Sequence, residues 1–390
     1  MQFVVEEKSD KIKGTRTVSH KKKKIGIDCR MWDETGIGRY IRNVVSQIAK
    51  IDHENQYVLF LLPKNMDSQD FPSNFSKVPV DIRWHTFAEQ TKLPFIFLSQ
   101  KLDLLFVPHF NVPILYPKKF VASIHDLTIL RVKTGRATTL PYPIYAIKRV
   151  AFRINILNTA IRAKNIFVVS NFVKEDLIKT FSLSSKKIIV APCAASPIFS
   201  RANNKDSFGV LQKYNIKTPY LFYVGNAHPH KNLETLLMAF AKIIETHPDL
   251  FLVLGGKKEF FYERLEREVA STKIASNVIF PGFIEDADLP ALYSSSLAFV
   301  TPSLYEGFGI QVLEAFACGT KVICSGVTSL PEVGGNAAFY FDPRNVEDIV
   351  AKVCAALDTP FNQEEARNQL KKFSWEISAQ NILNQINKLL

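Results

Sequence analysis

The sequence has no uninterrupted apolar run of about 18 residues, the length that predicts a membrane-spanning helix. Cysteine is scarce as well: its five residues are scattered and lack CxxC spacing, which argues against a zinc site or a disulfide framework. Charged residues follow Met1–Val5 at once, so the apolar core of a signal peptide is missing. These absences predict a cytoplasmic protein of a reducing compartment, with no metal site.

Positive charge is in excess. The 390 residues carry a formal net charge of +12, and residues 1–24 hold eight Lys and Arg against three acids. Such an excess attracts polyanions, among them an anionic bilayer or an anionic lipid-linked substrate. No nucleic-acid-binding motif accompanies it, so we expect no nucleic-acid partner. Residues 1–23 are expected to be a disordered basic tail, with peripheral contact at the inner face of the plasma membrane as the alternative.

Strand-like and helix-like segments alternate twice along the chain, and a polar linker at residues 200–217 separates the two series. The alternation predicts an α/β protein of two facing, doubly wound Rossmann-like domains, at residues 24–199 and 218–365. A last helix in residues 366–390 is expected to pack back toward the first domain. Ligands of such sheets bind at the carboxyl ends of the strands, which places the expected active site in the interdomain cleft.

Local patterns in the first domain give further predictions. Gly36–Gly38 is expected to form a turn, Asp81–Phe87 the third strand, and Asn171 the N-cap of a helix. Residues 141–163 mix aromatic, aliphatic and basic side chains, which is typical of amphipathic helices. Two interpretations of that segment stay open: a core helix with a basic outer face, or a helix that contacts a membrane or a lipid-linked substrate.

The stretch from Leu297 to Gly319 contains a short apolar strand, a glycine-punctuated turn at 306–309 and a helical pattern. A strand, a glycine loop and a helix N-terminus in that order make an anion site. Glu306 and Glu314 bracket this site, and a carboxylate is suited to accept hydrogen bonds from sugar hydroxyls. The alternative is a surface loop followed by an ordinary amphipathic helix.

A second strand-loop-helix segment runs through Gly225 to Asn232. Lys231 stands at the start of the helix, where the macrodipole disfavours a cation. The placement makes sense if an anion lies between Lys231 and the free N–H groups. The alternative is an exposed lysine that the capping loop tolerates.

These residues together resemble the family 4 retaining glycosyltransferases, the glycosyltransferase group 1 enzymes of the two-domain B-type fold. Glu306 to Glu314 looks like their E-x7-E signature, and the segment around His230, Lys231 and Asn232 looks like their diphosphate-binding element. Gly36-Ile37-Gly38-Arg39-Tyr40 resembles the glycine loop of the mannosyltransferase-like members, and Ile124-His125-Asp126 their strand-end histidine motif.

The resemblance implies a role for each matching residue. Glu306 would contact the donor hexose, Glu314 the ribose, and His125 the sugar, so that Glu306, Lys231 and His125 form the expected catalytic set. The diphosphate would be held by Lys231 and by backbone N–H groups around Phe308, Gly309 and Ile310, and Gly38 would approach the phosphates or the acceptor. The expected donor-binding residues are Gly38, Gly225, Asn226, His230, Lys231, Gly282, Phe283, Glu306, Gly307, Phe308, Gly309, Ile310 and Glu314.

One departure from the family pattern concerns the partner of Lys231. Many members of the family carry a basic partner for the lysine, usually arginine, just before it or directly after the strand glycine, where this chain has His230 and Asn226. The loss of an always-charged bidentate donor leaves less neutralisation of the diphosphate. A protonated His230 would compensate, and His228 or Arg39 are the other candidates.

The resemblance implies retaining, metal-independent transfer of a hexose, best matched by mannose from GDP-mannose or else a sugar from a UDP-sugar, with no cofactor. The acceptor would be a glycan or a lipid-linked molecule in surface polysaccharide biosynthesis. Glu306 and Glu314 lie on one loop and its helix, so they do not flank a bond as the carboxylates of a retaining hydrolase do. Alternatives are an epimerase-like enzyme and a non-catalytic nucleotide-sugar binder. An NAD-dependent oxidoreductase is disfavoured because Gly36–Gly38 lacks the third glycine of the dinucleotide fingerprint.

Overall fold

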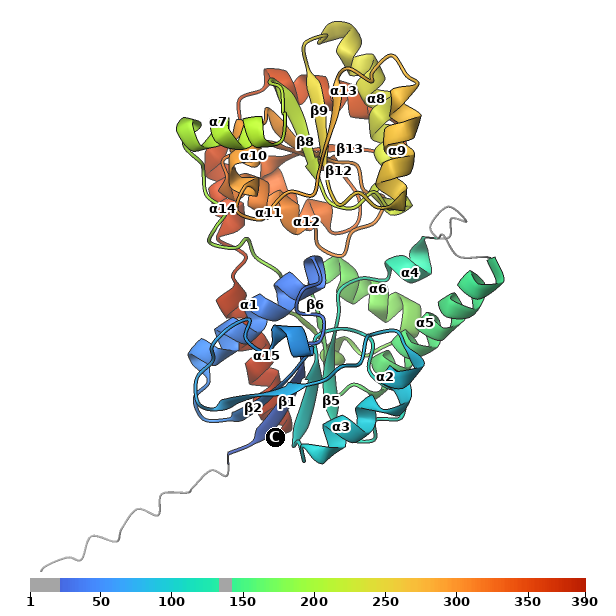
Figure 1. Cartoon of the computed structure of the whole chain (residues 1–390), viewed down its shortest axis with the longest axis vertical. Helices are drawn as coiled ribbons and strands as arrows, with labels where there is room; N and C mark the ends of the chain where they lie inside the picture. The colour runs from blue at the N-terminus through green and yellow to red at the C-terminus, as the bar shows by residue number, and fades with distance from the viewer. Residues whose placement is uncertain (1–21, 133–141) are drawn as a thin grey trace, which may run out of the picture.

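The computed structural model describes residues 22–132 and 142–390, so most of the predicted basic tail, residues 1–21, lies outside the described residues. Two α/β lobes are stacked one on the other (Figure 1). In the N-terminal half, the elements (η, 3-10 helix) are β1 (Lys24–Asp28), α1 (Gly36–Ile51), β2 (Gln56–Leu61), η1 (Pro63–Asn65), β3 (Phe75–Pro79), α2 (Phe87–Thr91), α3 (Leu93–Ser99), β4 (Leu104–Val107), β5 (Phe120–Ile124), α4 (Thr128–Arg131), α5 (Tyr142–Arg162), β6 (Ile166–Val168), α6 (Asn171–Phe181), η3 (Ser185–Lys187) and β7 (Ile188–Val190).

The C-terminal half continues the alternation. Its elements are α7 (Asn204–Lys213), β8 (Tyr220–Val224), η4 (Pro229–Lys231), α8 (Leu233–Thr246), β9 (Phe251–Gly255), α9 (Phe260–Ala270), β10 (Val278–Gly282), α10 (Leu289–Ser295), β11 (Ala298–Thr301), α11 (Ile310–Ala317), β12 (Val322–Ser325), α12 (Leu330–Gly334), η5 (Gly335–Ala337), β13 (Ala338–Phe341), α13 (Val346–Asp358), α14 (Gln363–Leu370) and α15 (Trp375–Leu389).

Each lobe is built on one parallel sheet. The N-terminal lobe has a seven-stranded sheet of order β3-β2-β1-β4-β5-β6-β7, and the C-terminal lobe a six-stranded sheet of order β10-β9-β8-β11-β12-β13. Neighbouring strands pair in parallel, with Ile25 opposite both Tyr57 and Leu104. The strands read as near-continuous apolar runs because helices cover both faces of a parallel sheet. This architecture confirms the predicted fold class.

The strand order reverses at one point in each sheet, between β1 and β4 and between β8 and β11. Ligands of doubly wound sheets bind outside the carboxyl ends of the strands at such a reversal. In the C-terminal lobe, these two ends lead into the loop after Val224 and the loop after Thr301. The two strand-loop-helix motifs of the sequence are therefore neighbours in space, although about 80 residues separate them.

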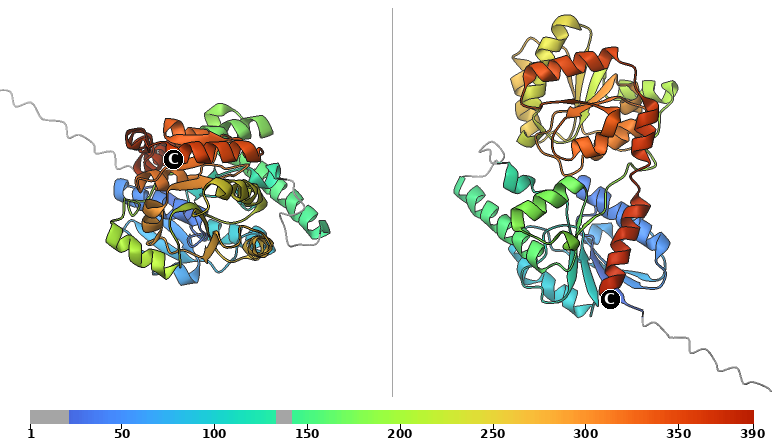
Figure 2. Two further views of the ribbon diagram at one scale, coloured as in Figure 1. Left: turned by 90° about the horizontal axis from the view of Figure 1, so that it is seen from above. Right: turned by 180° about the vertical axis from the view of Figure 1, so that it is seen from behind.

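The last helix, α15, belongs to the N-terminal lobe, where it packs beside α1 (Figure 2). The Ser378 hydroxyl donates to the Pro192 carbonyl, and the Asn55 amide donates to the Asn387 side chain at 3.2 Å. The range 200–217 is not only a link, because it contains α7, which packs against α10 of the C-terminal lobe. The chain thus passes between the lobes twice.

Three local predictions are wrong. Gly36–Gly38 forms the first turn of α1 instead of a separate turn. The third strand is Phe75–Pro79, an edge strand whose half-exposed polar residues hide its alternation, whereas residues 81–86 are irregular and Phe87 begins α2. Ser170, not Asn171, caps α6, because its hydroxyl accepts the Val173 N–H at 3.2 Å.

Among the described residues, no helix combines the length and the apolar character that crossing a bilayer requires. The predicted amphipathic segment at 141–163 forms the single helix α5 over its described part.

Candidate functional site

Two loops of the C-terminal lobe, those after β8 and β11, are bonded to each other. The Leu304 N–H donates to the His230 carbonyl at 2.8 Å. Asn232 adopts a left-handed backbone with φ of 60°, and its side-chain amide donates to the Pro302 and Pro343 carbonyls at 3.1 and 2.7 Å. These bonds hold Lys231, the residue before Asn232, against the 303–309 loop.

Lys231 and Glu306 form an ion pair between these loops. The Lys231 Nζ lies 2.5 Å from Glu306 Oε1, and the Ser303 hydroxyl donates to the same oxygen at 2.7 Å. Burial raises the pKa of the Glu306 carboxyl, but Lys231 and Ser303 outweigh burial and hold that pKa below its ordinary value. Glu306 is therefore an ionised carboxylate with a lysine beside it. The sequence predicted both residues for the site but not that they contact each other.

The glycine turn after Glu306 leads into a helix with a free N-terminus. Gly309 has φ of 88°, and an added Cβ there would lie 2.5 Å from the Leu330 side chain, so both the backbone angle and the packing require glycine. The helix α11 begins at Ile310 with no side-chain cap and no acid in its first turn. Its first N–H groups are therefore available to an anion. The buried Phe308 ring packs edge-on against Phe373.

The N-terminal lobe touches the same turn. An added Cβ at Gly307 would lie 2.1 Å from the His125 carbonyl oxygen, and the Ser170 hydroxyl donates to the Gly307 carbonyl at 2.7 Å. The Leu127 N–H donates to the Tyr305 hydroxyl at 3.2 Å. These contacts bring His125, the residue after β5 in the N-terminal lobe, to the 303–309 loop of the C-terminal lobe.

His125 is held in one orientation. Its Nε2–H donates to the Pro108 carbonyl at 2.9 Å, and its ring packs edge-on against Tyr40 at 4.6 Å between centroids. Burial lowers the pKa of His125 despite that hydrogen bond, so the ring is neutral near pH 7. A neutral imidazole fixed in this way is suited to position a sugar hydroxyl.

Glu314 is paired across the two lobes with Arg39. The Arg39 guanidinium contacts Glu314 Oε1 and donates to Asp286 Oδ1 at 2.9 Å, while the Tyr293 hydroxyl donates to Glu314 Oε2 at 3.1 Å. The Glu314 side chain is only 1% exposed. Burial raises its pKa to about 6, although Arg39 and Tyr293 act in the opposite direction. Sequence reasoning missed Asp286 and Tyr293, for which no local motif exists.

Gly38 lies beside Arg39 in the first turn of α1. An added Cβ at Gly38 would lie 2.4 Å from the Trp32 carbonyl oxygen, so the close approach of the two backbones requires glycine. A pocket of about 230 Å³ opens between the lobes beside Arg39, lined also by Arg42 and Asn43 of α1 and by Asp286. Gly38 and Arg39 are therefore placed at the interlobe gap.

The remaining predicted donor residues lie on the loops after β8 and β10. The Asn226 carbonyl accepts the Tyr223 hydroxyl at 2.7 Å, and the His230 ring stacks on His228 at 5.9 Å. Burial and Lys231 lower the pKa of His230 to about 4, so it adds no charge near pH 7. Gly225 has φ of 155°, Gly282 ends β10 with φ of 81°, and the Phe283 ring beyond it is 52% exposed.

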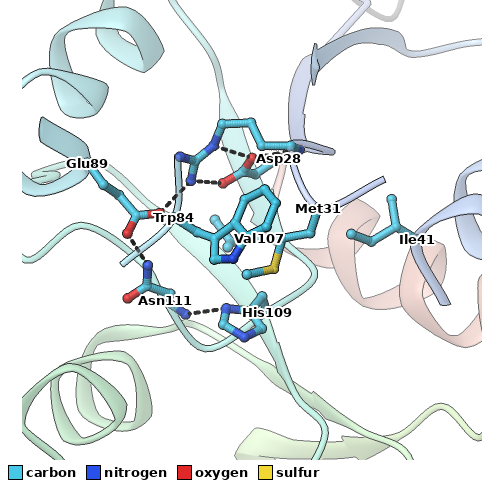
Figure 3. Close-up of a pocket in the computed structure, with 9 residues that line it drawn as sticks. Asp28, Met31, Ile41, Trp84, Glu89, Val107, His109 and Asn111 are labelled. Atoms are coloured by element: carbon cyan, nitrogen blue, oxygen red, sulfur yellow. Dashed lines mark hydrogen bonds and ion pairs between the residues drawn. The ribbon is translucent and has the colours of Figure 1, made fainter. Parts of the chain in front are cut away.

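A polar cluster that the sequence did not reveal lies at the carboxyl ends of β1 and β4 (Figure 3). The buried Arg30 side chain bonds to Asp28 at 2.7 Å and to Glu89 at 2.7 Å, and Glu89 contacts the Asn111 amide. The enclosed space is only about 10 Å³, so the cluster is satisfied internally and shapes the loops of the N-terminal lobe. Within the described residues, no group of three or more His, Cys, Asp and Glu could hold a metal ion.

Two facing Rossmann-like lobes, with paired strand-end loops between them, define the B-type glycosyltransferase fold. Solved structures with this fold superpose on nearly the whole chain. The superposition with sucrose-phosphate synthase from Thermosynechococcus elongatus includes 94% of this chain and 99% of that protein, with a TM-score of 0.75 and 19% sequence identity. The superposition with Anabaena Alr3699/HepE in complex with UDP and glucose includes 93% of this chain and 99% of that protein, with a TM-score of 0.72 and 14% sequence identity.

The chain belongs to the glycosyl transferases group 1 family, family 4, and is mannosyltransferase-like. The sequence profile of that family, described as Glycosyl transferases group 1, matches residues 210–374. The O-antigen chain mannosyltransferase B of Escherichia coli is 30% identical over 365 residues, which cover 88% of this chain and 93% of that protein. The family resemblance predicted from the motifs is thereby confirmed.

Proposed function

We propose that this protein is a retaining hexosyltransferase that moves mannose from GDP-mannose to a glycan or lipid-linked acceptor in surface polysaccharide biosynthesis. The observation that carries the proposal is the Lys231–Glu306 ion pair between the loops after β8 and β11. The neighbouring Gly307 packs against the backbone of His125 in the other lobe. The choice of mannose rests on the similarity to the O-antigen chain mannosyltransferase. The complex of HepE with UDP and glucose supports a nucleotide-sugar donor.

In this proposal, the donor replaces the protein's own ion pairs. The diphosphate takes Lys231 and the free N–H groups at the start of α11, which releases the Glu306 carboxylate to accept hydroxyls of the hexose. The ribose diol takes Glu314, which releases Arg39 toward the phosphates. Arg39 then supplies the second cation that Asn226 and the neutral His230 do not.

The reaction breaks the bond between the anomeric carbon and the diphosphate oxygen and forms a bond from the acceptor oxygen to the same carbon. Negative charge develops on the departing diphosphate, where Lys231 and the helix N-terminus stabilise it. The acceptor hydroxyl attacks from the face of the leaving group, so a diphosphate oxygen takes its proton and the anomeric configuration is retained. His125, neutral and held by Pro108, orients the sugar.

A thermal-shift screen of GDP, UDP and their sugars tests donor binding. A ligand at a hundred times its Kd stabilises the fold by about 2.7 kcal/mol, and we expect GDP and GDP-mannose to raise Tm more than the uridine ligands do. Product formed from GDP-mannose and a synthetic acceptor should keep the α configuration of the donor in an NMR spectrum. No response to any nucleotide, or an inverted product, would refute the proposal. Binding without turnover would support the non-catalytic binder.

A further inference from the structure

The outer face of α5 is apolar and exposed. The side chains of Ile147, Ile161 and Val150 are 71%, 60% and 58% exposed. Globular proteins seldom expose several aliphatic side chains next to one another to this extent. The exposed aliphatic residues follow one another at intervals of three or four along the helix: Ile144, Ile147, Val150, Ile154, Leu157 and Ile161. At about 100° per residue they fall within an arc of about 140°, which makes one continuous stripe.

The opposite face of α5 is fixed to the lobe. The Thr159 hydroxyl donates to the Phe110 carbonyl at 2.6 Å, and the Asn155 amide donates to the Asn111 side chain at 2.7 Å. Ile156 is buried between these positions. These contacts keep the helix from rotating to bury its stripe, whose side chains stay exposed. The helix lies at the side of the N-terminal lobe (Figure 1).

The charge on α5 itself has one sign. The sequence of α5 contains four basic residues and no acid. From residue 104 to residue 174 the only acid is Asp126, whose carboxylate accepts the Thr128 N–H at 2.8 Å. Lys148 and Arg153 are exposed on either side of the stripe. An apolar face bordered by cations is suited to the boundary between headgroups and acyl chains of an anionic bilayer.

We propose that the outer face of α5 docks on an anionic lipid bilayer, with the six aliphatic side chains inserted and Lys148 and Arg153 against the lipid phosphates. The charge favours this occupant over a second copy of the chain, because two such faces brought together would place their cations opposite each other. The inference does not depend on the proposed reaction, since the surface and the candidate site are formed by different residues.

The test is cosedimentation of the full chain with vesicles of phosphatidylcholine alone or mixed with phosphatidylglycerol, without donor or acceptor. We expect binding to the mixed vesicles and at least a tenfold loss of it in the variant Ile147→Ser, Val150→Ser, Ile154→Ser. The matched control is Phe208→Ser, Met238→Ser, Ile377→Ser, which removes apolar side chains of similar exposure elsewhere and should bind unchanged. All six side chains are exposed, so both variants should keep the wild-type melting temperature.

Charge and alternative occupants are tested in the same assay. Lys148→Gln with Arg153→Gln should reduce binding about 30-fold, at about 1 kcal/mol for each charge near the surface. Binding that survives the aliphatic variant but disappears when residues 1–20 are removed would overturn the proposal in favour of the tail. Equal binding to both vesicle types, or a wild-type dimer in light scattering that the aliphatic variant abolishes, would also overturn it.

Discussion

Arg39 in the N-terminal lobe and Glu314 in the C-terminal lobe form an ion pair across the interlobe gap, at a carboxylate that is almost fully buried. The two residues are 275 positions apart in the chain. Removal of one partner of a buried pair costs about 3–5 kcal/mol, because the other charge is left uncompensated. This contact therefore holds the lobes together at the carboxylate that we assign to the donor ribose.

The coupling between Arg39 and Glu314 should depend on the nucleotide. A double-mutant cycle with Arg39→Ala and Glu314→Gln, measured by urea unfolding, should give a coupling free energy of at least about 1.5 kcal/mol without ligand. With saturating GDP the coupling should fall, since the ribose takes the place of Arg39 on the carboxylate. The exposed pair Lys242–Glu347 is the control and should show about 0.5 kcal/mol or less. A coupling that GDP leaves unchanged would contradict the exchange.

The Glu314 carboxyl should make stability fall with rising pH. Its pKa in the folded protein is about 6, above the ordinary value of 4.5. The stability it contributes is fully present below pH 4.5 and is lost as the pH rises through 6, an effect of about 2 kcal/mol. The unfolding free energy of the wild type minus that of Glu314→Gln should therefore fall by about 2 kcal/mol from pH 4 to pH 7. A constant difference would show that the carboxyl titrates normally.

Lys231 and Glu306 should have opposite effects on nucleotide affinity. Lys231→Ala removes the charge that stabilises the leaving group, so we expect kcat to fall about 100- to 1,000-fold and GDP to bind more weakly. Glu306→Gln should also lower kcat, but GDP should bind at least as tightly because the carboxylate no longer competes for Lys231. Calorimetry and steady-state kinetics separate the two effects. Weaker GDP binding by Glu306→Gln would argue against this competition.

Gly307→Ala should disturb the contact between the lobes. The added Cβ would lie 2.1 Å from the His125 carbonyl oxygen, a distance that forces one backbone to move. We expect kcat to fall at least tenfold, because displacing His125 by about 1 Å misorients the sugar. Gly209→Ala in α7 is the matched control, since nothing lies within 4 Å of its added Cβ. Equal kcat values for the two variants would show that the Gly307 contact does not serve the reaction.

Much of the fold was predictable because it depends on local patterns. Continuous apolar strands alternate with amphipathic helices, which determines a doubly wound sheet in each half. The errors occur where tertiary packing overrides local preference. Gly38 enters a helix despite its low propensity because the close Trp32 carbonyl excludes any side chain. The edge strand β3 was missed because one of its sides is solvated and its sequence does not alternate clearly.

The two strand-loop-helix motifs and the family resemblance were readable from the amino-acid sequence alone. The same holds for the choice of Lys231, Glu306 and Glu314 as candidate site residues, because each depends on short spacing or on composition. Which of these residues contact one another depends on the tertiary structure. The pairing of Lys231 with Glu306 follows from the strand order that makes β8 and β11 neighbours. The pairing of Arg39 with Glu314 follows from how the lobes face each other. Contacts of this kind depend on the packing of whole sheets, and no local pattern of residues encodes them.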